Sequence, residues 1–182
     1  GHDFPGVTLV GILAADMSLY NCDFRSSERT FQLLTQAAGR AGRGSEPGEV
    51  VIQTYTPEHY SIEAAKEQDY RMFYEQEIRY RDLLNYPPVW NLLVILISSR
   101  EEENATKAAE QIEKKIAQMQ LKTVAVIGPT EPAVAKINDI YRKVLYLKCG
   151  NYDTLVEIKD SLEQYLGTLW HLEPFAFREM KY

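Results

Sequence analysis

The second half of the chain contains four short apolar runs and two amphipathic stretches, and their order limits the folds open to it. The runs lie at residues 90–99, 123–127, 140–149 and 169–177, and the amphipathic stretches at 101–119 and 153–166. Short apolar runs rich in β-branched residues are typical of strands, whereas apolar residues at every third or fourth position are typical of helices. The helical spacing is clearest for Ala105, Ala108, Ala109, Ile112, Ile116 and Met119. The order β-α-β-β-α-β predicts a ferredoxin-like α+β domain.

The beginning of the chain predicts a different, α/β arrangement. Two runs rich in β-branched residues, 7–13 and 49–55, have the length of buried strands. Residues 14–25 are expected to form a loop. Ser26 or Ser27 is then a candidate cap for a helix that ends at the glycines after Ala38.

A change of character near residue 67 predicts a domain boundary. A short helix is expected at 57–66, and aromatic residues at helical spacing then mark a further helix. That helix should stop before Pro87 because a residue that precedes proline disfavours the helical region. We therefore expect one domain over residues 1–67 and a second, with the aromatic helix at its start, over 68–182.

Composition excludes several classes of protein. The chain has 182 residues, of which 45% are hydrophobic, and a net charge of −6, so a basic protein that coats nucleic acid is excluded and any DNA contact needs a local basic patch. Cys22 and Cys149 form no C-x-x-C pair, so no metal site is expected and a reducing cytoplasm fits. No apolar run is long enough to span a membrane. Because the chain opens on a loop-like stretch at Gly1, we expect a piece of a longer protein.

Residues 36–43, Q-A-A-G-R-A-G-R, are the stretch with the clearest chemistry. Arg40 and Arg43 lie three residues apart at the glycine-rich end of the helix expected before them. A guanidinium stays charged and binds phosphate oxygens through its planar fork, which suits it to stabilise charge on a transferred phosphoryl group. The alternative is a glycine-capped helix end whose arginines are solvated and complement the helix dipole.

Several stretches resemble a known family. Residues 36–43 resemble motif VI of superfamily 2 helicases, and residues 1–10, G-H-D-F-P-G-V-T-L-V, resemble the end of motif V. The longer stretch D-F-R-S-S-E-R-T-F-Q-L-L-T-Q-A-A-G-R-A-G-R, residues 23–43, resembles the PriA family of replication-restart helicases (primosomal protein N′), as do residues 48–60, 77–88 and 141–148. The resemblance spans nearly the whole chain and implies a remnant of a RecA-like second lobe before the ferredoxin-like domain.

The resemblance implies roles for individual residues in an ATP-dependent DNA helicase. Arg40 and Arg43 would be catalytic and face the γ-phosphate of ATP across the interface between two lobes. Gln36 and Gly39 would help to bind the nucleotide.

Motif V would contribute three further residues. Gly1 and Asp3 would lie near the nucleotide, and His2 is a candidate DNA contact. The phosphate-binding loop, the acidic residues that hold Mg²⁺ and the cysteines that hold Zn²⁺ in this family would belong to other parts of the protein. The chain by itself should therefore neither hydrolyse ATP nor bind zinc.

The expected strand at residues 140–149 suggests a second site. Alternation places Leu145, Leu147 and Cys149 on one face, and Arg142, Val144, Tyr146 and Lys148 on the other. A sheet face with aromatic and basic side chains can stack bases and neutralise phosphates. We therefore take Arg142, Tyr146 and Lys148 as candidate DNA contacts. Trp90, on the neighbouring first strand, could join them on this face. The alternative is that this face packs against the helicase lobe or is plain amphipathic surface.

Three functions are compatible with the sequence. The first is part of a helicase that restarts stalled replication forks and starts primosome assembly, with DNA, primosome proteins and single-stranded-DNA-binding protein as partners. The second is a stand-alone adaptor that binds nucleic acid or protein, and the third is a purely structural interaction module. A phosphate-binding loop encoded upstream would select the first.

Overall fold

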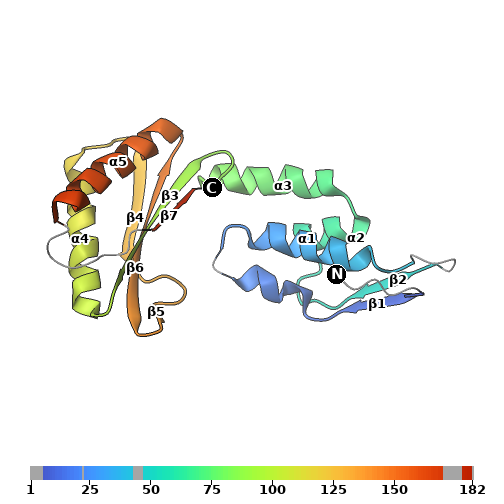
Figure 1. The fold of residues 1–182 in the computed structure, drawn as a ribbon. Coiled ribbons are helices and arrows are strands. Elements are labelled where there is room, and N and C mark those ends of the chain that lie inside the picture. Colours follow the sequence, from blue (N-terminus) through green and yellow to red (C-terminus); the bar gives the residue numbers. More distant parts are fainter. Residues whose placement is uncertain (1–5, 22, 43–46, 170–177, 182) are drawn as a thin grey trace. The chain divides into compact units, whose positions relative to one another are not determined.

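A computed structural model describes residues 6–21, 23–42, 47–169 and 178–181, with side chains described up to residue 166 (Figure 1). The chain divides into two compact units, unit 1 over Gly1–Tyr80 and unit 2 over Arg81–Tyr182. Both mix helices with strands. The description below takes each unit by itself.

Unit 1 contains a two-stranded parallel sheet covered by helices. Its elements are β1 (Leu9–Ile12), the 3-10 helix η1 (Ala15–Tyr20), α1 (Ser26–Ala38), β2 (Glu49–Ile52), α2 (Tyr60–Glu67) and most of α3 (Tyr70–Leu83). The pairing of β1 with β2 runs from Leu9 opposite Glu49 to Ile12 opposite Ile52. The core comprises Ala15, Phe31, Leu34, Ile62, Ala64, Ala65 and Phe73.

The first turn of α1 differs from the expected serine cap. Ser26 is already helical, and its hydroxyl donates a hydrogen bond to the carbonyl of Asn21 at 2.9 Å. Asp23 lies just before the helix, and its carbonyl accepts from the Ser26 amide at 3.0 Å. The expected loop at 14–25 also contains η1, which begins after Ala14 in the left-handed conformation.

The aromatic helix α3 explains why the units divide later along the chain than residue 67. Phe73, on its first half, is 3% exposed and stacks on Phe31 at 4.5 Å between ring centroids. Tyr60 stacks on Phe73 at 6.0 Å and on Tyr80 at 5.3 Å. These contacts attach most of α3 to α1 and α2.

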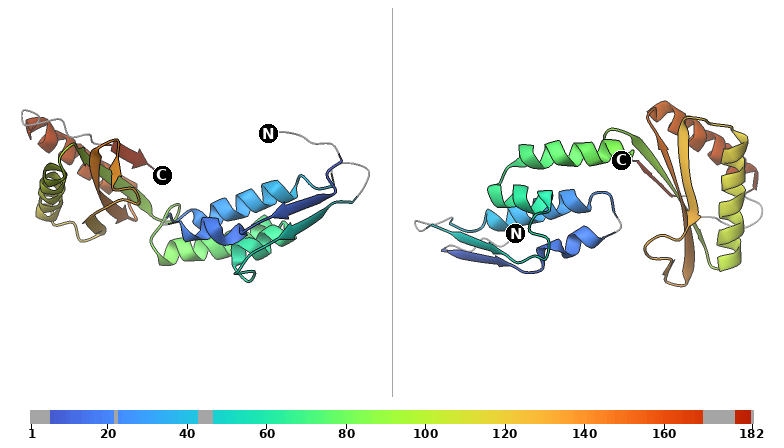
Figure 2. Two further views of the ribbon diagram at one scale, coloured as in Figure 1. Left: turned by 90° about the horizontal axis from the view of Figure 1, so that it is seen from below. Right: turned by 180° about the vertical axis from the view of Figure 1, so that it is seen from behind.

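Unit 2 is an antiparallel sheet with two helices on one face (Figures 1 and 2). Its elements are β3 (Asn91–Ser99), α4 (Glu102–Gln118), β4 (Val124–Thr130), β5 (Lys136–Ile137), β6 (Ile140–Cys149), α5 (Tyr152–Leu169) and β7 (Arg178–Lys181). The sheet order is β4-β6-β3-β7, and β5 pairs with the start of β6. The expected strand at 169–177 lies almost wholly outside the described residues.

The helices bury the faces that their periodicity predicts. From α4 the side chains of Ala105, Ala108, Ala109, Ile112 and Ile116 are buried, and from α5 those of Leu155, Ile158 and Leu162. They pack on Leu93, Ile95 and Ile97 of β3 and on Leu145, Leu147 and Cys149 of β6. Met119 packs against the edge of this core.

Candidate nucleotide and nucleic-acid sites

The end of α1 leads into residues 39–42, which we call the arginine loop. The amide of Gly39 still donates to the Thr35 carbonyl at 3.0 Å, as in a helix. The amides of Arg40 and Ala41 then bond to carbonyls only three residues back, at 3.1 Å each, so the helix tightens into a turn.

Gly42 fixes this loop against the strands. Its φ of +70° lies in the left-handed region, and its amide donates to the carbonyl of Val7 at 3.0 Å. A Cβ at Gly42 would lie 2.9 Å from the amide nitrogen of Gly48. The arginine loop is therefore tied to the beginnings of both chain segments that form the parallel sheet.

The candidate nucleotide residues are placed only in part. Gln36 and Gly39 are exposed at the end of α1, and Arg40 beside them is half-buried. Arg40 is thus partly accessible and lies at the same end of α1 as Gln36. Gly1, His2, Asp3 and Arg43 lie outside the described residues.

The start of α1 holds a charged group that we did not single out from the sequence. The Asp23 carboxylate accepts from the Arg25 amide at 3.0 Å and lies 3.3 Å from the Arg25 Nε and 3.0 Å from the Arg29 Nη1. Burial alone would raise the pKa of Asp23, but the hydrogen bonds from Arg25 and the two positive charges lower it. Asp23 therefore stays ionised and orders the beginning of the helix that carries the arginine loop.

Asp16 is a second buried acid that the sequence did not reveal. It is 1% exposed, and its Oδ2 accepts from the Tyr55 amide at 3.3 Å. The Ala15 amide donates to the Gln53 carbonyl at 3.0 Å beside it. Both bonds join the segment after β1 to the segment after β2, so Asp16 extends the link between the strands beyond the sheet.

The two faces of β6 differ as the alternation predicts. Leu145, Leu147 and Cys149 are buried under the helices, which confirms their shared face. The opposite side of the sheet, which we call the outer face, is less open than an exposed platform would be. There Val144 is 2% and Lys148 7% exposed, whereas Arg142 and Tyr146 are half-buried.

The Lys148 ammonium contacts the segment between α3 and β3. Its Nζ donates to the Leu84 carbonyl at 2.9 Å and lies 3.4 Å from the centre of the Tyr86 ring. Close by, the Arg81 Nη1 donates to the Pro87 carbonyl at 2.7 Å. The Lys148 ammonium therefore holds residues 84–86 against the outer face, and its donors are turned to protein groups.

Arg142 lies near the other end of β6, where the β5–β6 hairpin begins. Its amide donates to the Ala135 carbonyl at 2.8 Å, and its Nη1 lies 3.4 Å from the Val134 carbonyl. Beyond it, the Lys136 Nζ lies 4.6 Å from the centre of the Tyr141 ring. Tyr141 alternates with Arg142 along β6, so the Lys136–Tyr141 pair lies on the opposite side of the sheet from Arg142.

Within the described ranges, no group of three or more His, Cys, Asp or Glu side chains could hold a metal ion. Among the helices of that same part of the chain, none combines the length and the apolar character that crossing a bilayer requires.

Comparison with known proteins first defines the class. Residues 82–170 match the family described as the primosomal protein N C-terminal domain. The chain is also 44% identical over 166 residues to the replication restart protein PriA of Bacillus subtilis, and 42% identical over 164 residues to that of a Synechocystis species, which covers 91% and 90% of it. Residues 82–170 therefore form the domain that this family model describes, and the chain as a whole is similar to the C-terminal part of PriA proteins. It spans about a fifth of the length of these relatives, 21% and 19% respectively.

Proposed function

We propose that this chain is the C-terminal part of an ATP-dependent DNA helicase that restarts stalled replication forks and starts primosome assembly. The observation that carries the proposal is the 44% identity to a replication restart protein over 91% of the chain. DNA, primosome proteins and single-stranded-DNA-binding protein would be the partners of the complete enzyme.

In this proposal unit 1 is the remnant of a RecA-like second lobe. Parallel β1 and β2 with α1 between them in sequence support that assignment. Arg40 would face the γ-phosphate of ATP bound by the other lobe, together with Arg43, while Gln36 and Gly39 would contact the nucleotide. The hydrogen bond from the Gly42 amide to the Val7 carbonyl supports this role, because it fixes the backbone of the loop from which the Arg40 side chain extends. Mg²⁺ and Zn²⁺ would be held by residues outside this chain.

Unit 2 would be the ferredoxin-like domain. Its order of elements and its sheet order, β4-β6-β3-β7, support that topology. For DNA, Arg142 and Tyr146 would form the contact surface on the outer face. Lys148 would serve this surface by positioning residues 84–86, since its own ammonium already binds the Leu84 carbonyl.

The nucleotide role is tested in the complete enzyme. Arg40→Ala should lower DNA-stimulated ATP hydrolysis by about 10³-fold or more while DNA binding persists, as removal of an arginine finger does. Arg71→Ala is the matched control, because Arg71 is exposed on α3 and pairs with Glu75 at 2.9 Å. Unchanged turnover in the Arg40 variant would remove the catalytic assignment. The 182-residue chain alone should show no phosphate release in the same assay.

The DNA role is tested with the chain itself by fluorescence anisotropy of a labelled oligonucleotide at low and high salt. Arg142→Ala combined with Tyr146→Ala should weaken binding and flatten its salt dependence, because one phosphate contact and one stacking surface are lost. Lys114→Ala, on the exposed side of α4, is the control for a general loss of positive charge. Equal binding by the double variant and the unaltered chain would contradict the platform.

A further inference from the structure

The outer strand of the unit 2 sheet lies beside a groove. Among the described residues, β4 pairs with β6 on one side and with no strand on the other. An unpaired edge directs N–H and C=O groups outward and can accept another strand. Val126 is 40% exposed and Ile127 48% exposed on this strand, which is unusual for β-branched residues of a sheet that is otherwise well buried.

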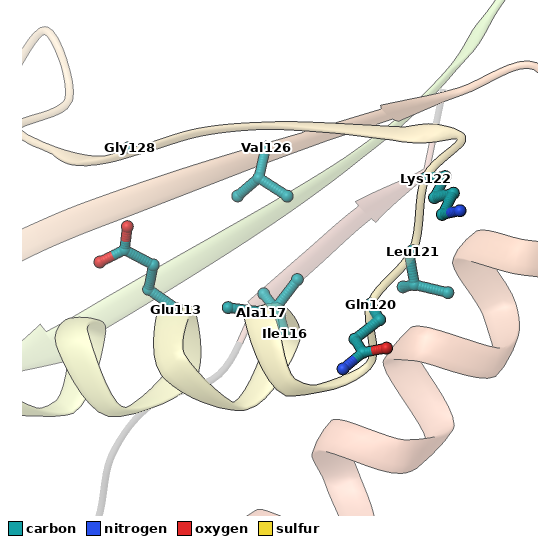
Figure 3. A pocket seen from close by; sticks show the side chains of 8 residues that line it. All are labelled: Glu113, Ile116, Ala117, Gln120, Leu121, Lys122, Val126 and Gly128. Carbon is teal, nitrogen blue, oxygen red and sulfur yellow. The ribbon is translucent and has the colours of Figure 1, made fainter.

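A groove of about 430 Å³ opens between this edge and α4. Its floor is apolar, with Ile116 and Ala117 from α4, Leu121 from the connecting turn and Val126 from β4. Figure 3 shows the Val126 side chain directed from the strand toward Ile116 and Ala117 on the helix. An apolar side chain from an added strand would therefore enter the groove beside Val126.

Two opposite charges stand at the ends of the groove. Glu113 projects from α4 toward Gly128, and Lys122 lies where the chain enters β4 (Figure 3). Both side chains are exposed, and neither forms an ion pair within the described part of the chain. The groove thus offers a negative group near the end of β4 and a positive group near its beginning.

Gly128 limits the length of strand that can be added. Its φ is +105°, and a Cβ there would lie 2.6 Å from the Val144 carbonyl oxygen. The pairing with β6 shifts register between Ile127 and Thr130. The regular edge therefore comprises residues 124–127, and side chains on the groove side alternate with those of Ala125 and Ile127 on the outer face.

From these observations we propose that β4 binds a short extended peptide of a partner protein as an added antiparallel strand. The main chain of the peptide pairs with residues 124–127, with an acidic residue opposite Val124 and an apolar residue opposite Val126, and a basic residue lies just beyond the paired segment, beside Gly128. These three positions share the groove side and meet Lys122, the apolar floor and Glu113 in turn. Main-chain hydrogen bonds supply affinity, and the groove supplies specificity.

The test uses the isotope-labelled 182-residue chain and the capped peptide Arg-Thr-Ile-Thr-Glu, titrated while amide resonances are followed by NMR. We expect saturable shifts in residues 123–127 and along the groove side of α4, with a dissociation constant below about 1 mM. The charge-exchanged peptide Glu-Thr-Ile-Thr-Arg should bind several-fold more weakly. The same is expected of a peptide N-methylated at the amides that face the edge. Equal binding of all three peptides, or shifts confined to other surfaces, would overturn the proposal.

Variants separate the groove from the rest of the sheet. Val126→Lys should weaken peptide binding by about tenfold or more, since a lysine on an edge strand opposes pairing. Ala117→Glu fills the groove from α4 without altering the strand and should act in the same direction. Ile127→Thr, on the outer face, should leave binding unchanged. Concentration-dependent self-association of the unaltered chain that Val126→Lys abolishes would instead make a second copy the occupant and overturn the peptide proposal.

Discussion

Unit 1 and unit 2 bury their sheets to different extents. In unit 1 the helices cover one side of β1 and β2, while Leu9 and Val51 point outward, 60% and 51% exposed. In unit 2 the side away from the helices is itself partly closed, with Leu92 and Val144 buried. The difference indicates that unit 2 buries apolar side chains on both sides of its sheet, whereas unit 1 presents apolar surface suited to packing against further structure.

The same contrast separates the candidate sites. The arginine loop has a fixed backbone, yet its chemistry in our proposal needs a nucleotide held by another lobe. The edge groove and the outer face of unit 2 consist of residues from that unit alone. Both tryptophans, Trp90 and Trp170, belong to unit 2, so tryptophan fluorescence follows this unit without a contribution from unit 1.

The largest effect should come from the core of unit 2. Leu145 is fully buried between β6 and the helices. Leu145→Ala should lower the free energy of unfolding by about 2–5 kcal/mol, through lost burial and the cavity that remains. Urea unfolding followed by tryptophan fluorescence measures it. Phe31→Ala, in the core of unit 1, should leave that tryptophan transition in place; a matching shift would show that the units unfold together.

A smaller effect is expected at Lys148. Lys148→Met keeps the length of the side chain but removes the bond to the Leu84 carbonyl and the contact with the Tyr86 ring. The expected loss is about 1–3 kcal/mol in the tryptophan-monitored transition, because a part-buried hydrogen bond from a charged donor and a cation–π contact are both removed. Lys114→Met, on the exposed side of α4, should be neutral. If the two variants matched, Lys148 would not close the outer face.

Gly42 tests the fixed backbone of unit 1. Gly42→Ala should cost about 1–2 kcal/mol for the left-handed conformation alone, with more for the close approach to Gly48. Gly39→Ala is the matched control, because Gly39 has φ −65° and a Cβ there would lie in ordinary contact with two carbonyl oxygens, of Thr35 at 3.4 Å and of Gln36 at 3.9 Å. Far-UV circular dichroism melting should show the loss while the tryptophan transition stays unchanged. Equal melting of both variants would mean that the loop is not held by Gly42.

The smallest effect concerns His59, whose Nδ1 accepts from the Ser61 amide at 3.3 Å at the start of α2. Burial lowers the pKa of His59 from its ordinary 6.5, against the opposing charges of Glu77 and Glu58. The unfolded chain therefore binds a proton at His59 more readily than the folded chain does. The stability that neutral His59 contributes is present above pH 6.5 and is lost as the pH falls toward the folded-state pKa. His59→Asn keeps an acceptor that does not titrate. Between pH 7.5 and 5.5, the melting temperature of unit 1 should fall less in this variant than in the unaltered chain.

Regular elements were predictable where one periodicity dominates. The strand at 140–149 has the bounds of β6, and the apolar stripe of α4 is buried as its spacing indicates. Both signals are local, since the strand follows from alternation at every second residue and the helix from apolar residues three or four positions apart. The same reasoning found Leu145 and Leu147 on the core face.

Features that depend on distant backbone were not predictable. Lys148 alternates with core residues as a solvent-facing lysine would, but its acceptor is a backbone carbonyl at Leu84, which leaves no trace in side-chain pattern. Phe73 belongs to unit 1 because its ring meets Phe31, a contact that spacing along α3 cannot reveal. Asp16 lies in a stretch without periodicity, since a 3-10 helix is short and its pattern is weak.

The enclosure of the Lys148 ammonium also gives this lysine an unusual chemical reactivity. Acylating reagents attack the neutral amine, and they need access to its nitrogen, which here lies between the Leu84 carbonyl and the Tyr86 ring. Modification of Lys148 therefore requires residues 84–86 to lift away first, while exposed lysines such as Lys114 react without any opening. The rate at which Lys148 is labelled, measured by mass spectrometry, therefore reports how often the segment that follows α3 opens.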